Sequence, residues 1–220
     1  MVLPEVTTQG ARHLDLGCGP RPKNPYQAAE LHGLDIFAGI AELGPHFKQG
    51  DLILDPLPYA SNSFDSVSAF DVLEHIPRVA VNFSTRQTVF PFIRLMSEIH
   101  RVLKPQGLFY ALTPCFPAEE AFLDPTHVNI ITRNSHLYFC GPEPYAKLYG
   151  FEGQFEAVEA RRVYPGYCFS AQKPKYFGLK NWHKRWLKNK ASHLVWQLQA
   201  VKKQATPSPS AASAVSEKRT

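Results

Sequence analysis

The stretch Leu14-Asp15-Leu16-Gly17-Cys18-Gly19, near the start of the 220-residue chain, decides the fold. Residues 12–16 are typical of a short strand, which breaks directly into a turn that contains two glycines. Glycine allows the backbone to pass close to a ligand at a point where a Cβ atom would clash. The stretch therefore predicts the first strand of a nucleotide-binding α/β domain.

Further acids stand where later strands are expected to end. Asp35 lies 18 residues after Gly17, at the end of a short strand over residues 34–36. An acid at this position can accept hydrogen bonds from both hydroxyls of a ribose. Asp51 and Leu52 follow one strand later, where they would contact an adenine. Because open α/β sheets bind ligands at the carboxyl ends of their strands, these residues predict a nucleotide site at one sheet edge.

The middle of the chain alternates between strand and helix patterns. Strands are expected over residues 65–70, 108–112 and 154–163. A helix is expected over residues 84–103, where apolar residues recur at steps of three and four. Strands separated by helical patterns imply βαβ units and a mostly parallel sheet.

The C-terminal part of the chain gives a more mixed pattern. Residues 133–149 favour a helix that is interrupted near Gly141-Pro142. Residues 164–192 resemble an insertion, and the alternation over 193–201 predicts a final strand, with a helical continuation as the alternative. The tail over residues 204–220, rich in Ser, Ala and Pro, is expected to be disordered.

The order and spacing of these motifs resemble class I S-adenosylmethionine-dependent methyltransferases, in particular the small stand-alone members of the type 11 kind. The resemblance covers roughly residues 12–115. The stretches that carry it are LDLGCGP (14–20), GLDI (33–36), residues 50–65, DVLEHI (71–76) and EIHRVLKPQG (98–107). It implies a Rossmann-like three-layer sandwich with a seven-stranded, mostly parallel sheet whose last strand is antiparallel, and S-adenosylmethionine as cofactor.

The resemblance also implies which residues hold the cofactor. By position these are Asp15, Gly17, Cys18 and Gly19 at the methionine part, Asp35 at the ribose, Asp51 and Leu52 at the adenine, and Phe70 and Asp71 near the sulfonium. One departure is Arg21, which stands between two prolines where the family often has a further glycine. A stiffer loop is expected there, followed by a short helix between Pro25 and Gly33.

Two alternatives compete with this interpretation of the glycine turn. A dinucleotide-dependent dehydrogenase would usually show GxGxxG directly opening a helix, whereas residues 17–22 read GCGPRP. A purely structural turn would leave the acids at the strand ends unexplained. Both alternatives are therefore less favoured than a methyltransferase.

The candidate for a catalytic base is His127, in the segment DPTH over residues 124–127 that follows a proline-rich loop. Asp124 is expected to orient His127 as a carboxylate–imidazole pair. The alternative is that His127 caps the following segment. His75 is a second candidate or a structural loop residue. No metal site is expected, because the nearest further histidine along the chain, His136, lies nine residues away.

Four aromatic residues add a candidate for the acceptor pocket. Tyr138, Phe139, Tyr145 and Tyr149 fall close together in the sequence. They would line a pocket for the methyl acceptor or form ordinary core packing.

The net charge of +5 conceals an asymmetry along the chain. Residues 1–171 hold 13 Lys and Arg against 18 Asp and Glu, whereas residues 172–220 hold 11 against one. Residues 176–190 predict a basic amphipathic helix that contacts an anionic membrane, clamps a phosphate on the acceptor or packs as a lid. The acidic remainder argues against nucleic-acid binding.

The composition bounds the compartment and the domain count. No run of about 18 apolar residues is present, and the N-terminus lacks the pattern of a secretory signal. The four cysteines form no CxxC pair and are expected to be reduced. We expect one cytoplasmic domain over residues 1–203, possessing its own core.

These observations favour O-methylation of a small molecule, with a saccharide or lipid-linked precursor as acceptor. N- or C-methylation of a metabolite is the first alternative. A non-catalytic binding protein with a methyltransferase-like fold is the second. The sequence makes no prediction of the oligomeric state.

Overall fold

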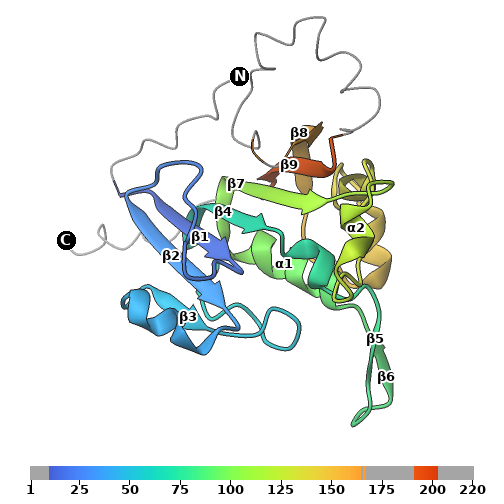
Figure 1. Cartoon of the computed structure of the whole chain (residues 1–220), viewed down its shortest axis with the longest axis horizontal. Helices are drawn as coiled ribbons and strands as arrows, with labels where there is room; N and C mark the ends of the chain where they lie inside the picture. Colours follow the sequence, from blue (N-terminus) through green and yellow to red (C-terminus); the bar gives the residue numbers. More distant parts are fainter. Residues whose placement is uncertain (1–9, 165, 167–190, 203–220) are drawn as a thin grey trace, which may run out of the picture.

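The computed structural model describes residues 10–164, 166 and 191–202. Seven strands form one sheet in the order β3-β2-β1-β4-β7-β9-β8 (Figure 1). Their bounds are β1 Arg12–Leu16, β2 Glu30–Asp35, β3 Phe47–Gln49, β4 Phe64–Phe70, β7 Leu103–Pro114, β8 Phe155–Val163 and β9 His193–Ala200. Strands β3, β2, β1, β4 and β7 pair in parallel, and β9 runs antiparallel to β7 and β8. The mostly parallel sheet with an antiparallel last strand is confirmed.

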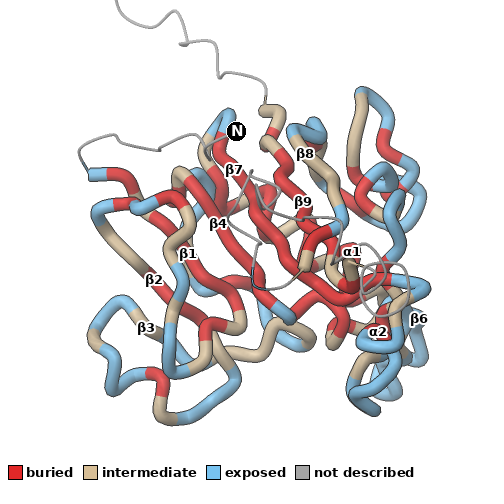
Figure 2. The backbone as a smooth tube through the Cα atoms, turned by 45° about the horizontal axis from the view of Figure 1, so that its top comes forward, coloured by how far each residue is buried: buried red, intermediate tan, exposed pale blue. Residues whose placement is uncertain are grey.

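The sheet has two faces of different character. Alternate residues such as Leu14, Val67 and Trp196 are buried in the main core, which also holds the apolar side of helix α1 (Pro91–Val102). Figure 2 shows that burial is greatest along the central strands β1, β4, β7 and β9. The intervening residues face the other way, and there the buried set includes His13 and other polar side chains. The second face of the sheet therefore carries a polar network beneath the ends of β1 and β4.

The helix expected over residues 84–103 is wrong in its first part. The helix begins only at Pro91, and residues before it form a hairpin of β5 (Ala80–Asn82) and β6 (Gln87–Val89) that projects from the body in Figure 1. Proline suits the first turn of a helix, but its ring disfavours helical geometry in the preceding residue, and Phe90 has φ −121° and ψ 78°. The turn of the hairpin is closed by the side chain of Asn82, which accepts hydrogen bonds from the backbone of Ser84 and Thr85.

The short helix expected between Pro25 and Gly33 is also absent. Residues 20–29 form turns, and the backbone of Lys23 and the side chain of Asn24 supply their hydrogen bonds. The prolines around Arg21 remove backbone donors that a helix would need. The segment therefore crosses the second face of the sheet as a loop.

Helix α1 fixes the loop between β3 and β4. Arg101 donates from its guanidinium to the carbonyls of Leu57 and Tyr59, at 2.9 and 2.8 Å. Two turns earlier, Arg94 donates to the carbonyls of Ile53 and Leu54. These contacts satisfy backbone groups of residues 50–63 that are not paired in a helix or strand. The loop that carries the expected adenine residues is thus anchored to the core helix.

The remaining elements are short. They are the 3-10 helices η1 (Ala38–Leu43), η2 (Leu73–His75), η3 (Ser135–Phe139) and η4 (Tyr145–Tyr149), and the helix α2 (Glu120–Leu123). The interruption expected near Gly141-Pro142 is confirmed, although the two pieces around it are 3-10 helices. The final strand expected over 193–201 is confirmed as β9.

Some predictions fall outside the described residues. The insertion over 164–192 is described only at its margins, and the basic helix over 176–190 and the tail over 204–220 lie outside the description. Within the described residues, no helix has both the length and the apolar character needed to cross a bilayer.

Candidate active site

The glycine turn at the end of β1 has the geometry that the sequence predicts. Gly17 and Gly19 have φ values of +60° and +52°, in the left-handed region that favours glycine. A Cβ atom at Gly17 would lie 2.3 Å from Cγ2 of Val72, whereas one at Gly19 would project into open space. The thiol of Cys18 is buried, and burial raises its pKa to about 12. Only the backbone of this turn is therefore presented to a ligand.

Asp35 ends β2 beside the glycine turn. Its Oδ2 accepts a hydrogen bond from the backbone N–H of Gly19 at 2.8 Å, and its Oδ1 accepts one from Phe37 at 2.9 Å. Each carboxylate oxygen can accept a second hydrogen bond. The carboxylate thus pins the turn and can still accept both hydroxyls of a ribose.

Asp15 ends a buried hydrogen-bonded chain on the second face of the sheet. Its Oδ1 accepts a hydrogen bond from Oγ of Ser68 at 2.6 Å, and its Oδ2 accepts one from the backbone of Lys23 at 2.7 Å. His13 lies between Ser68 and Ser66, with ring nitrogens 2.8 and 2.7 Å from their hydroxyls. Burial lowers the pKa of His13 to about 3, so its ring is neutral.

The same burial acts on the charge of Asp15. Desolvation raises the pKa of Asp15 to about 6, although the hydrogen bonds from Ser68 and Lys23 oppose the shift. The carboxylate is largely ionised at neutral pH, and its buried charge lowers the stability of the fold. A buried charge of this kind at a sheet edge is typical of a functional site.

Two further acids complete the edge of the sheet. Asp51 follows β3, and its Oδ1 accepts hydrogen bonds from the backbone of Ile53 and Leu54 at 2.7 and 3.2 Å. Leu52 packs partly buried against the core beside it. Asp71 follows β4 with φ +55° and is exposed. Because these strands are parallel, the acids that follow β2, β3 and β4 share one edge.

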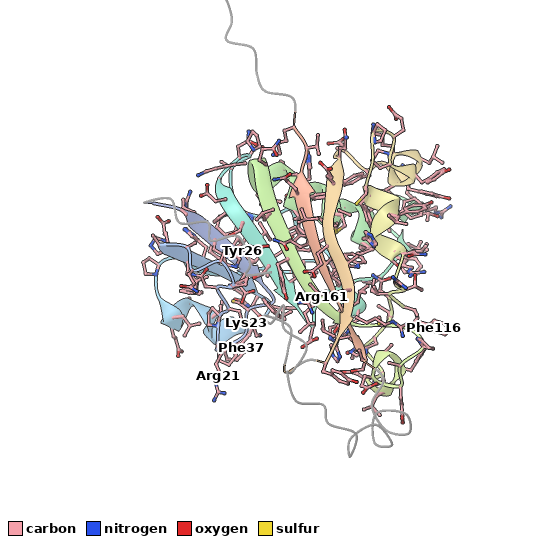
Figure 3. The ribbon with its side chains drawn as sticks, turned by 90° about the horizontal axis from the view of Figure 1, so that it is seen from above. Arg21, Lys23, Tyr26, Phe37, Phe116 and Arg161 are labelled. Atoms are coloured by element: carbon pink, nitrogen blue, oxygen red, sulfur yellow. The ribbon has the colours of Figure 1, made fainter. Side chains whose placement is uncertain are left out.

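A set of cations and aromatic rings lies along the same edge. The Nζ atom of Lys23 lies 4.9 Å from the ring centre of Phe70, whose own ring lies 5.5 Å from that of Tyr110. Figure 3 shows that Arg21, Lys23 and Phe37 gather at the same end of the sheet. The site predicted for the methionine part is therefore bordered by positive charge as well as by Asp15.

An open hollow of about 610 Å³ continues this edge beyond Asp71. The described residues that line it are Asp71, Glu74, His75, Pro114, Glu120, Leu123, Asp124, Pro125, His127 and His193. Four of them are acids and three are histidines, and no lysine or arginine is among them. Asp71 belongs both to this hollow and to the row of acids, so the hollow adjoins the predicted sulfonium end.

The fold brings the candidate histidines together. The rings of His75 and His127 meet edge to face, with their centres 4.8 Å apart. The carboxylate of Asp124 accepts hydrogen bonds from the backbone and hydroxyl of Thr126, and these bonds lower its pKa. Oγ1 of Thr126 lies 2.9 Å from Nδ1 of His75. The hydrogen-bonded chain from Asp124 therefore runs to His75, in place of the direct pair with His127 that the sequence predicted.

The tyrosine cluster lies elsewhere. Tyr138 and Tyr149 line a separate cavity of about 390 Å³ with Phe139 and Arg78, which shares no lining residue with the hollow. Tyr145 stacks on Tyr138 at 6.1 Å between ring centres. These residues therefore do not border the groups around His127.

Comparison with known proteins identifies the family. The family described as a methyltransferase domain matches residues 14–111, which span β1 to β7 and include the glycine turn and the three acids. Residues 14–111 thus belong to a methyltransferase domain. No curated protein sequence matches significantly.

Solved structures show the same fold at low sequence identity. A chain in the complex of the Haloferax volcanii Trm112 methyltransferase activator with a methyltransferase is 15% identical, with a TM-score of 0.56, and the match covers 90% of this chain and 86% of that one. An S-adenosylmethionine-dependent methyltransferase from Mesorhizobium loti is 18% identical, with a TM-score of 0.53 and coverage of 90% and 93%. The cyclase SpnF is 17% identical, with a TM-score of 0.51 and coverage of 89% and 76%.

The cofactor of the methyltransferase is S-adenosylmethionine, and the residues present fit it. The open space in front of Gly19 is where an added Cβ atom would intrude, and the Asp35 carboxylate beside it keeps acceptor capacity. We expect Asp35 to hold the ribose, Asp51 and Leu52 to border the adenine, and Asp15 to lie at the methionine part. When bound, the cofactor supplies a methyl group activated by its sulfonium.

The sequence left the role of Glu74 open and gave no role to His193, and both residues line the hollow. Glu74 is 2% exposed, and desolvation raises its pKa to about 7 even though Thr113 donates a hydrogen bond to Oε2. His193 begins β9, and its Nε2 lies 3.5 Å from Oδ1 of Asp71. The expected antiparallel last strand was a usable signal for His193. An antiparallel strand begins at the edge where its parallel neighbour ends, and His193 at the start of β9 pairs with Pro114 at the end of β7.

Proposed function

We propose that the methyltransferase transfers a methyl group to a hydroxyl of an uncharged small molecule, with a saccharide as the favoured acceptor, bound in the hollow between Asp71 and Asp124. The observation that carries this proposal is the composition of the hollow. The hollow adjoins the sheet edge where we expect S-adenosylmethionine to bind. Its imidazoles and carboxylates can form hydrogen bonds with the hydroxyls of a polyol. Its described lining contains no cationic side chain to hold a phosphate.

Methyl transfer requires donor and acceptor to be held in line, and a hydroxyl acceptor must lose its proton. Two candidate proton acceptors of the hollow, the imidazoles of His75 and His127, meet edge to face with their ring centres 4.8 Å apart. We assign the role of base to His127, whose Nδ1 is buried without a hydrogen-bond partner. Asp124 and Thr126 position His75 as its neighbour.

The charge of the hollow favours two acceptor classes and disfavours a third. Four carboxyl groups repel a phosphorylated or carboxylated acceptor, and a neutral hydroxyl meets no such cost. The same carboxyl groups attract an amine, which makes N-methylation the second candidate. A lipid-linked saccharide, and contact with an anionic membrane, depend on residues 176–190 and are tested separately by sedimentation with anionic vesicles.

The decisive experiment is transfer of labelled methyl from S-adenosylmethionine to panels of neutral saccharides, amines and phosphorylated sugars. We expect label in the neutral saccharides and none in the phosphorylated ones. His127→Ala should lower turnover and leave the affinity for S-adenosylmethionine unchanged, because His127 lies outside the donor site. The matched control is His46→Ala, an exposed histidine on the far side of β2. Label confined to amines would replace the hydroxyl proposal by N-methylation.

A further inference from the structure

Two residues that line the hollow each have a buried polar atom without a hydrogen-bond partner among the described residues. These atoms are Oε1 of Glu74 and Nδ1 of His127. Glu74 is 98% buried, since only 2% of it is exposed, and Thr113 satisfies its other oxygen. Leaving a buried acceptor unsatisfied costs about 1–3 kcal/mol. A group that satisfies both atoms at once is therefore expected between them.

His75 lies beside His127 and has a third electron pair to offer. The Asp124 carboxylate can only accept, so the hydroxyl of Thr126 donates to it, at 2.7 Å. Oγ1 of Thr126 must then accept from His75, which places the ring proton on Nδ1. In the neutral ring, Nε2 keeps the free electron pair. Metal-binding histidines commonly have this arrangement, in which the other ring nitrogen donates to a polar partner.

The three groups converge closely enough to share one ion. One ligand atom from each of Glu74, His75 and His127 lies within 4.8 Å of the others. Ligands of a zinc ion at 2.0–2.2 Å lie about 3.0–3.5 Å apart, so rotation of the two half-buried imidazoles closes the difference. We propose that Glu74, His75 and His127 bind one divalent transition-metal ion. Two imidazoles and one carboxylate suit Zn²⁺, Co²⁺ or Mn²⁺ and leave coordination positions open.

The surroundings of the cluster favour a cation. Asp71, Glu120 and Asp124 line the same hollow, and no lysine or arginine does so among the described lining residues. An ion held by these residues would lie at the hollow that they line, where the acceptor is proposed to bind. This role of the ion rests on the proposed function: an ion there would bind the acceptor hydroxyl and lower its pKa, in place of proton removal by free His127.

A second cluster of similar composition provides the control. Glu30, His32 and His46 also lie within 4.8 Å of one another. There, however, the guanidinium of Arg12 lies 3.0 Å from both Glu30 and Nε2 of His32. Two of the three residues of that cluster, Glu30 and His32, thus already contact a cationic side chain.

The test is metal binding by the full chain, measured without any acceptor. The purified protein is treated with a chelator, dialysed and titrated with Zn²⁺ by calorimetry and with Co²⁺ by visible absorption. We expect one equivalent to bind, with binding lost in Glu74→Gln and His127→Ala and retained in His46→Ala. Thr126→Val should weaken binding about tenfold, because it releases the orientation of His75.

Further readouts separate a folding defect from a lost ligand. Each variant is checked by its melting curve and by calorimetry with S-adenosylmethionine. In the unmutated protein, Co²⁺ should shift the NMR signals of two histidines, and this result does not depend on any variant. The proposal is overturned if the chain binds no stoichiometric ion, if Glu74→Gln and His127→Ala bind it unchanged, or if His46→Ala abolishes binding.

Activity measurements then distinguish this inference from the proposed function. Metal binding without label in any hydroxyl acceptor would refute the proposed function and leave the metal site standing. In a second outcome, the metal-free enzyme transfers methyl at the full rate even though the same protein binds metal in the titration. That result would show that the ion plays no part in the acceptor step. Loss of transfer on chelation and recovery with Zn²⁺ or Co²⁺ is the expected outcome.

Discussion

Replacing Asp15 by Asn should make the protein more stable and the cofactor site weaker. The buried chain that ends at Asp15 can reverse its direction. The Asn amide would donate to Ser68, Ser68 to His13, and His13 to Ser66, while the backbone of Lys23 still finds the amide oxygen. The hydrogen bonds are thus kept and only the buried charge is lost.

The pKa of Asp15 sets the size of the effect. Burial raises it from 3.8 to about 6, so the folded protein holds a proton that the unfolded chain has released between these values. Stability contributed by the protonated acid is therefore lost as the pH rises from about 4 to 7. With 1.36 kcal/mol for each pKa unit, the loss over this range is about 2.5 kcal/mol. Asn does not titrate, so the advantage of Asp15→Asn over the natural protein should grow by that amount.

The assay is urea unfolding of both proteins at pH 4, 5, 6 and 7, without cofactor. The difference in the free energy of unfolding between the two proteins is the quantity of interest, because other titrating groups cancel from it. Calorimetry should also show at least a tenfold loss of affinity for S-adenosylmethionine, about 1.4 kcal/mol, if the ionised Asp15 serves the cofactor. A stability difference that stays constant from pH 4 to pH 7 would refute the reasoning about burial.

Three further predictions concern the turn, the ribose site and the anchored loop. Gly17→Ala should lower the melting temperature and abolish cofactor binding, because φ is +60° and the new Cβ would lie 2.3 Å from Val72; a normal melting curve would contradict this. Asp35→Asn should weaken cofactor binding at least tenfold by calorimetry, since an amide replaces one of the two acceptor oxygens by a donor NH2 group; unchanged affinity would remove Asp35 from the site. Arg101→Met should cost about 2 kcal/mol in urea unfolding and raise the KM for S-adenosylmethionine, because the loop after β3 loses its anchor; an unchanged KM would show that the loop does not shape the adenine site.

The sequence pattern predicts a strand well where apolar residues are buried on one face of the sheet or on both. In β9 the alternation of Leu194 and Trp196 with His193 and Val195 was sufficient, because each set faces a different side of the sheet. The start of β2 was not predicted because Glu30 interrupts the apolar pattern. Glu30 is satisfied by Arg12 of the neighbouring strand, at 3.0 Å, and such a pairing is not visible before the strands are aligned.

The hairpin before α1 shows a different limit. Val89 and Phe92 fit a helical period, and the pattern alone extended the helix toward residue 84. Pro91 was the local signal that contradicted it, because proline begins helices far more readily than it continues them. The spacing of the apolar residues therefore extended the predicted helix past Pro91, the residue at which the helix begins.

The two halves of the proposed active site differ in how far the sequence alone predicts them. The donor half follows from chain order, because the ends of parallel strands share an edge and Asp35 and Asp51 follow two such ends. The acceptor half depends on contacts between distant segments. No local pattern places Thr126 against His75, and none shows that Glu74 is buried with one oxygen unsatisfied.

The electrostatics of the hollow connects the proposed reaction with the proposed ion. Removing a proton from a hydroxyl creates negative charge beside Asp71, Glu74 and Asp124, and two like charges 4 Å apart repel by about 4 kcal/mol at an effective dielectric constant of 20. A neutral imidazole can take the proton, but it does not reduce this repulsion on the oxygen. A divalent cation bound among the same carboxylates would reduce the repulsion, because its positive charge would stabilise the oxyanion. The acid-rich lining therefore adds an electrostatic argument for the proposed ion at Glu74, His75 and His127, and the chelation experiment decides between that ion and free His127.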